Sequence, residues 1–259
     1  MLTLTAGQIE AWIAVYLWPF VRIGACLMVA PLFSAGMVPA RLRIVMAAAL
    51  TVLVAPLLPA PPQVGPFSPA GVVITVQQLV IGVAIGFVLQ IAFDALAMGG
   101  QLLANTMGLS FAFNVDPLRG TGTPVLGQFY SLMATLTFVA LDGHLAIIRA
   151  VVDGFQSLPV GTSGLGPDGL WQVALWGTQL FRGALMVALP GLTALLVVNL
   201  AFGVVSRAAP TLNLFAIGFP VTLIGGLLIV LAGLPAVQSG FMALVGEGFG
   251  LIRTLLGGG

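Results

Sequence analysis

Four polar residues that lie close together in the sequence are the ones whose types could carry out chemistry. They are Asp142, His144, Arg149 and Asp153, and they follow an apolar run. An acid and a histidine could exchange a proton, but residues two apart do not share a face of a helix. Placed beside a glycine at a helix end, Asp142 and His144 are better explained as a helix cap or an interfacial ion pair. The sequence therefore predicts no catalytic pair here.

Motifs for catalysis and for metal binding are also missing. The chain has no GxSxG, no HExxH, no P-loop and no paired-aspartate motif. Its only histidine leaves no partner for a two-histidine metal site, and its only cysteine, Cys26, excludes an internal disulfide and a cysteine cluster. We expect a protein that is not an enzyme and that needs no cofactor and no metal.

The composition identifies the solvent of this protein. Of 259 residues, 59% are apolar and 6% are charged, whereas a soluble domain carries about 25% charged residues. The charged set consists of eight arginines and seven acids, with no lysine. This set is too small for the charged shell of a soluble protein, and its arginines are too dispersed for a nucleic-acid-binding face. The lipid bilayer is therefore the expected solvent, and nucleic acid is excluded as a partner.

The apolar residues gather in runs that suit membrane helices, which need roughly 20 such residues each. Six runs are present, at 12–33, 44–58, 70–93, 129–141, 174–205 and 212–237. Asp94 is expected to end the third run, and the stretch 95–113 and the tail from 238 would add a seventh and an eighth helix. Segments 114–127 and 157–169 are rich in turn formers and read as loops. The sequence predicts an all-α, multi-helix integral membrane protein.

Glycines and prolines inside these runs predict close packing and kinks. Gly82 and Gly86 form a GxxxG pair, a spacing that lets two membrane helices approach closely. Pro190 and Pro220 each remove a backbone donor and are expected to kink the last two long runs. The short polar turn at 206–213 joins those runs, so the sequence predicts a bent helical hairpin.

Arg22 lies inside the first apolar run, where a charge costs roughly 2.5 to 3.5 kcal/mol. One interpretation is contact with an ion or substrate. The interpretation we favour is structural, a buried pairing with an acid from another helix or subunit.

The segment 108–127 combines two aromatic side chains with dense turn chemistry. Phe111 and Phe113 lead into Asn114, Asp116 and Pro117, and glycines and a further proline follow. A re-entrant loop at membrane depth is tolerated where it is buried in protein or lines a cavity. A loop that fills a pore and an ordinary turn outside the membrane both fit the composition.

Several strings, taken in their order and spacing, resemble the FliR family, a subunit of the flagellar type III export gate, over nearly the whole chain. They read PARLRIVMAAALTVLVAP (39–56), MGLSFAFNVDP (107–117), PVLGQF (124–129), ALDGHLAIIRA (140–150) and VNLAFGVVSRAAPTLNLFAIGFPVTL (198–223). The last string is the most specific. Its ending is more similar to the flagellar branch of the family than to the injectisome branch.

The resemblance implies a role in an assembly. It implies kinked helical hairpins, with a FliP-like part at 1–170 and a FliQ-like hairpin and tail at 171–259. The implied partners are FliP and FliQ in a closed hetero-oligomeric gate, FlhB, and unfolded flagellar proteins as export substrates. The implied location is the bacterial inner membrane within the flagellar basal body, with the complex partly protruding toward the periplasm.

The resemblance also implies that segment 107–123 is a plug loop in the pore. Phe111, Phe113 and Val115 would fill the closed pore by apolar packing. Residues that form turns or give the loop freedom to move would be Gly108, Asn114, Pro117, Gly120 and Gly122, within a segment that also holds Met107 and Asp116. Arg207 and Asn213 would fix the turn of the last hairpin, as structural contacts.

Two other functions stay open at this point. One is the related export gate of an injectisome. The other is an ion-coupled secondary transporter of small solutes, which shares kinked helices and a buried arginine but usually shows internal repeats. We find no convincing repeat in this sequence.

Overall fold

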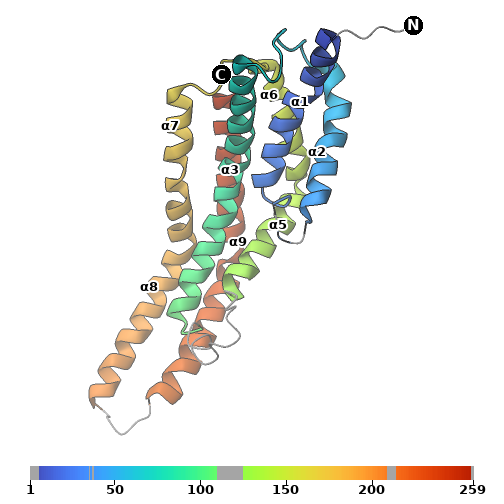
Figure 1. The fold of residues 1–259 in the computed structure, drawn as a ribbon. Helices are drawn as coiled ribbons and strands as arrows, with labels where there is room; N and C mark the ends of the chain where they lie inside the picture. The colour runs from blue at the N-terminus through green and yellow to red at the C-terminus, as the bar shows by residue number, and fades with distance from the viewer. Residues whose placement is uncertain (1–5, 35, 37, 110–124, 209–213, 258–259) are drawn as a thin grey trace. The chain divides into compact units, whose positions relative to one another are not determined.

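The computed structural model describes residues 6–34, 36, 38–109, 125–208 and 214–257. These residues form helices joined by short connections, and none of them lies in a strand (Figure 1). The helices are α1 (Ala6–Val29), α2 (Ala40–Val54), the short 3-10 helix η1 (Ala55–Leu57), α3 (Pro69–Thr106), α5 (Val125–Ala140), α6 (Gly143–Ser157), α7 (Pro167–Trp176), α8 (Thr178–Ala208) and α9 (Leu214–Leu255).

Among the described residues, five helical segments are long and apolar enough to cross a membrane. They are Trp12–Val29, Ala40–Leu57, Pro69–Thr106, Pro167–Ala208 and Ile217–Leu255. Helices α5 and α6 form a sixth candidate, because they pass the same test together but bend by 66° where they meet. The prediction of an all-α, multi-helix membrane protein is confirmed.

Two helix boundaries differ from those expected. Helix α3 continues past Asp94 to Thr106, so the third apolar run and the stretch after it form one helix of 38 residues. Helix α9 likewise joins the sixth run and the tail into 42 residues. Asp94 lies on an exposed face of α3, so the helix continues past it without burying its carboxylate. The expected end of α2 before the proline cluster at 59–62 is observed.

The longest helices exceed the bilayer. At 1.5 Å per residue, the 42 residues of α9 extend about 63 Å and the 38 residues of α3 about 57 Å. The hydrocarbon core is about 30 Å thick. Part of each helix therefore extends beyond the hydrocarbon core.

The chain forms two compact units, and neither is continuous in sequence. Unit 1 consists of residues 1–91, 138–177 and 246–259, and unit 2 consists of residues 92–137 and 178–245. This grouping follows contacts, whereas the division at 170 rests on resemblance to other subunits and stays a prediction.

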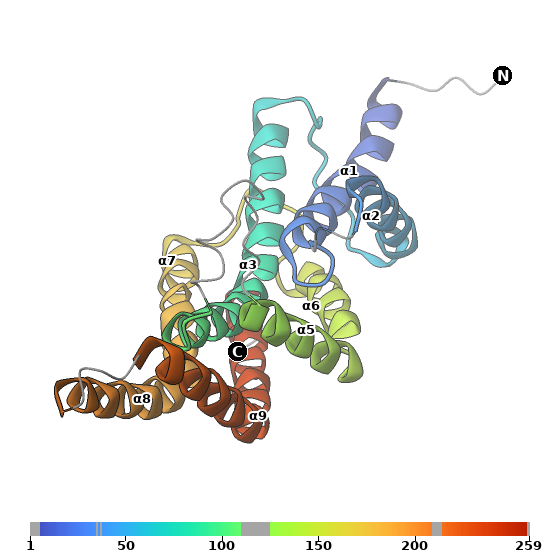
Figure 2. The ribbon, with the colours of Figure 1, turned by 90° about the horizontal axis from the view of Figure 1, so that it is seen from below.

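Unit 1 is built around the contact of α1 with α2 and with the first part of α3. Helices α1 and α2 lie side by side (Figures 1 and 2). A Cβ atom added at Gly86 would lie 2.8 Å from the Ala30 amide nitrogen and 2.9 Å from the Cys26 carbonyl oxygen, and one at Gly82 would meet the Arg22 carbonyl oxygen. Glycine is thus what allows the backbones of α1 and α3 to approach this closely.

Unit 2 packs its helices in the same way. A Cβ atom added at Gly99 would lie 2.9 Å from the Val187 Cβ, and one at Gly226 would lie 2.5 Å from the Met107 Cγ. Phe93 of α3 and Phe241 of α9 meet edge to face, with ring centroids 5.1 Å apart. Small residues and the Phe93–Phe241 pair therefore help to hold α3, α8 and α9 together in this unit.

We expect Gly82→Ala to lower the stability of the chain by about 2 kcal/mol or more, because the new methyl group must push α1 away from α3. The matched control is Gly233→Ala in α9, where a Cβ atom would meet nothing within 4 Å. This control should be neutral or slightly stabilising, since alanine favours a helix by up to about 1 kcal/mol over glycine. Thermal unfolding of the purified chain in detergent measures both. Equal midpoints for the two variants would contradict the close-contact explanation.

Candidate functional site

Arg22 is the most constrained polar residue of unit 1. It lies in α1 and is 0% exposed. Its Nε atom donates to the Gln78 Oε1 atom of α3 at 2.7 Å, and its two terminal nitrogens donate to the carbonyl oxygens of Gly154 at 3.1 Å and Leu158 at 2.9 Å. Its guanidinium carbon lies 4.1 Å from the ring centroid of Phe155. One side chain therefore joins α1, α3 and the end of α6.

The partners of Arg22 within the described part of the chain are neutral, and the acidic partner expected from the sequence is replaced by a helix end. Helix α6 ends at Ser157, and the last carbonyl groups of a helix lack partners within the helix and carry partial negative charge. Leu158, the residue after the helix, supplies one such oxygen, and Gly154 supplies a second oxygen that also accepts from the Leu158 amide at 3.0 Å. Arg22 thus caps the C-terminus of α6, and its purely structural role stays a prediction.

The polar group at 142–153 does not assemble into a catalytic site. Asp142 occupies the cap position of α6 in the left-handed conformation, with φ of 55° and no hydrogen bond from its side chain to the helix. The cap is formed instead by its carbonyl oxygen, which accepts from the amides of Leu145 at 2.9 Å and Ala146 at 3.0 Å. Asp142 therefore stands at the cap position, one of the two placements expected from the sequence, but its side chain forms no cap hydrogen bond. No cluster of metal-binding side chains occurs among the described residues.

The described beginning of the expected plug segment lies against α9 in unit 2. Met107 is 0% exposed and fills the space beside Gly226. Gly108 has a φ of 78°, a conformation that glycine adopts without strain, and a Cβ atom there would lie 3.3 Å from the ring of Phe219. The chain thus leaves α3 at a tightly packed point. The other plug residues fall outside the described residues: Phe111, Phe113, Asn114, Val115, Asp116, Pro117, Gly120 and Gly122.

The prolines expected to kink the last two helices lie within continuous helices. Pro190 is inside α8 and Pro220 is inside α9, and both are exposed. Their role as kinks stays a prediction. Arg207 is exposed in the last turn of α8, where a cation is favoured by the helix dipole.

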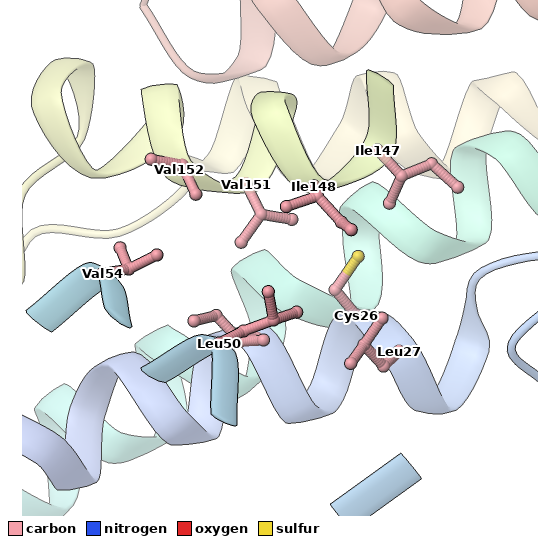
Figure 3. A pocket seen from close by; sticks show the side chains of 9 residues that line it. Cys26, Leu27, Leu50, Val54, Ile147, Ile148, Val151 and Val152 are labelled. Atoms are coloured by element: carbon pink, nitrogen blue, oxygen red, sulfur yellow. The ribbon is translucent and has the colours of Figure 1, made fainter. Parts of the chain in front are cut away.

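A small apolar cavity of about 10 Å³ lies between α1, α2 and α6 (Figure 3). Cys26 points toward α6 there, with Ile147, Ile148 and Val151 facing it. The space equals about one water molecule and has no polar lining to hold one. This cavity is a packing gap, and Cys26 is a buried core residue.

Comparison with known proteins decides the family. Residues 13–248 match the family described as bacterial export proteins, family 1. The chain belongs to that family. It is 38% identical over 256 residues to "Flagellar biosynthetic protein FliR" of Escherichia coli K12, an alignment that covers 99% of this chain and 98% of the relative. The protein of the same name from Pectobacterium carotovorum is 37% identical with the same coverage.

More distant members of the family extend the similarity. The FliR protein of Aquifex aeolicus is 30% identical over 232 residues, which is 88% of either chain. The resemblance to the FliR family that the sequence strings suggested is confirmed. Since the alignments run through both units, the similarity extends over nearly the whole chain and is not limited to one segment.

We expect Arg22→Gln to destabilise this FliR-family chain by about 2 to 5 kcal/mol, because it removes three hydrogen bonds, two of them buried and one partly buried. The matched control is Arg41→Gln, which removes an exposed arginine of α2 and should change stability by less than about 0.5 kcal/mol. Thermal unfolding in detergent again provides the measurement. If Arg22→Gln unfolds at the temperature of the unmodified chain, the capping role is wrong.

Proposed function

We propose that this chain is a non-enzymatic subunit of the flagellar type III protein export gate, required for assembly of the bacterial flagellum. The observation that carries this proposal is the near full-length similarity to relatives named flagellar biosynthetic protein FliR, at 37% and 38% identity. In this role the chain forms part of the pore for unfolded flagellar proteins. Energy for export comes from other subunits and the proton motive force, and this chain hydrolyses nothing.

The composition and the helices support a place in a larger membrane assembly. Large apolar side chains are exposed along α8 and α9, among them Leu196, Leu200, Leu228 and Leu231. We propose that FliP and FliQ subunits cover much of this surface, with FlhB associated with the complex. Helices longer than the hydrocarbon core suit a complex in the inner membrane that partly protrudes toward the periplasm.

The gate is closed in this proposal by the plug segment 107–123. Phe111, Phe113 and Val115 fill the pore by apolar packing until an exporting polypeptide displaces them. Buried Met107 and the positive φ of Gly108 support it, since they give the segment a fixed start from which it turns away from α3. Gly120 and Gly122 give the far side of the segment freedom to move. Arg207 fixes the turn between α8 and α9.

Purification of a tagged copy from its own cells tests the assembly. We expect mass spectrometry after mild detergent extraction to recover FliP-like and FliQ-like subunits in a fixed ratio to this chain. An untagged strain carried through the same extraction provides the background. A lone chain or a homo-oligomer, from an extraction that keeps another known membrane complex intact, would overturn the gate and favour a transporter.

Removal of the plug tests the mechanism. We expect deletion of residues 108–122 to preserve assembly but to raise the ion permeability of the closed gate, and Phe111→Ala with Phe113→Ala to raise it in part. The matched control is Phe67→Ala, a phenylalanine that is 82% exposed between η1 and α3. Ion flux into cells or liposomes that hold the assembled complex provides the readout. An assembled deletion variant that stays tight to ions would show that this segment is not the plug.

A further inference from the structure

A groove in unit 1 carries three charged side chains for which the export function gives no role. It has a volume of about 670 Å³ and lies between α6 and the C-terminal end of α9. Arg149 and Asp153 line it from α6, and Arg253 lines it from α9. The volume falls within the roughly 300 to 1,000 Å³ of small-molecule sites.

These charges are not used to hold the fold. The side chains of Arg149, Asp153 and Arg253 form no hydrogen bond and no ion pair with another described residue. Arg149 and Asp153 are four residues apart on one helix, a spacing that commonly pairs opposite charges, yet both are exposed and separate. Their side chains are therefore free to bind a ligand.

Two glycines keep the groove open. Gly246 and Gly250 lie one turn apart on the α9 wall, and a Cβ atom added to either would meet no atom within 4 Å. Close helix packing, which explains Gly82 and Gly86, does not explain these two. Glycine weakens a helix relative to alanine, so these two glycines do not stabilise α9. Their effect here is to leave space in the groove beside Ile252 and Leu256, which also line it.

We propose that this groove binds a zwitterionic phospholipid whose headgroup carries a phosphate and a primary ammonium. The two arginines donate to the phosphate oxygens, and Asp153 accepts from the ammonium. The acyl chain lies along the space beside Gly246 and Gly250. Arg253 stands in the last turn of a membrane-spanning helix, which is where arginine side chains reach lipid headgroups.

The charge pattern selects this ligand over other phosphates. An anionic phospholipid or free phosphate would satisfy the arginines but leave Asp153 facing a second anion. A choline headgroup has the right charges, but its trimethylammonium has no N–H to donate to the carboxylate. A phosphoethanolamine headgroup satisfies all three side chains.

Native mass spectrometry of the full chain in detergent tests this, with equal amounts of dioleoyl phosphatidylethanolamine, phosphatidylglycerol and phosphatidylcholine. We expect phosphatidylethanolamine to be retained preferentially. Arg149→Gln with Arg253→Gln should reduce its retention about tenfold or more, and Asp153→Asn should abolish the preference over phosphatidylglycerol. The control Arg41→Gln should retain the lipid as the unmodified chain does. Excess glycerophosphoethanolamine should displace the lipid, which separates headgroup recognition from binding by the acyl chains alone.

A second variant does not depend on charge. Gly250→Leu should fill the groove and reduce retention of the lipid without lowering the thermal midpoint, since an added Cβ atom meets nothing within 4 Å. The proposal is overturned if the unmodified chain prefers phosphatidylglycerol, or if the double arginine variant or Gly250→Leu retains phosphatidylethanolamine at the unmodified level. It is also overturned if the unmodified chain shows no lipid preference while Gly250→Leu abolishes recovery of partner subunits. In that case the groove seats a helix.

Discussion

The fold of unit 1 depends on the burial of one cation. Apolar helices in lipid have little to fix their relative register, because lipid tails are as apolar as the side chains they replace. Arg22 changes this, since a charge that is buried in protein must be compensated by hydrogen bonds. Its donors are satisfied only where Gln78 of α3 and the last turn of α6 are both at hand. The same side chain therefore binds α1 to α3 and to the last turn of α6.

The glycines of α3 contribute to the same contact between α1 and α3. Gln78, Gly82 and Gly86 are spaced by four residues and so lie on one face of α3. Gly82 faces the carbonyl oxygen of Arg22 on α1, and Gly86 faces that of Cys26. Arg22 and Cys26 are also four residues apart. Two rows of the same spacing thus run alongside each other. The close approach at Gly82 lies one turn from Gln78, which accepts from the Arg22 Nε atom at 2.7 Å.

Sequence patterns predicted the class of fold. They failed for helix boundaries and side-chain partners that depend on which face of a helix is exposed. The proline cluster at 59–62 ends α2 as expected, because proline acts through the backbone. Asp94 did not end α3. An aspartate on an exposed face of a helix does not interrupt it, and the periodicity of so apolar a run does not show which face is exposed. The acceptors of Arg22 are mostly carbonyl groups, which leave no mark in a sequence. Gln78 is a polar residue inside the run 70–93, but Gln77 and Gln90 lie in the same run, so composition does not single it out. The plug residues from Phe111 onward lie outside the described residues and stay predictions.

Helix α9 is long enough to cross the hydrocarbon core and to carry charged residues beyond it. Its exposed large apolar side chains extend from Ile217 to Met242, about 38 Å of helix, which fits a hydrocarbon core of about 30 Å when the helix is tilted by up to about 40°. The two charged residues of α9, Glu247 and Arg253, both follow this section. The remaining 13 residues, 243–255, add about 20 Å, which is longer than one headgroup layer. The last turns of α9 therefore cross the polar boundary of the bilayer, which is the depth at which a phospholipid presents its phosphate to an arginine.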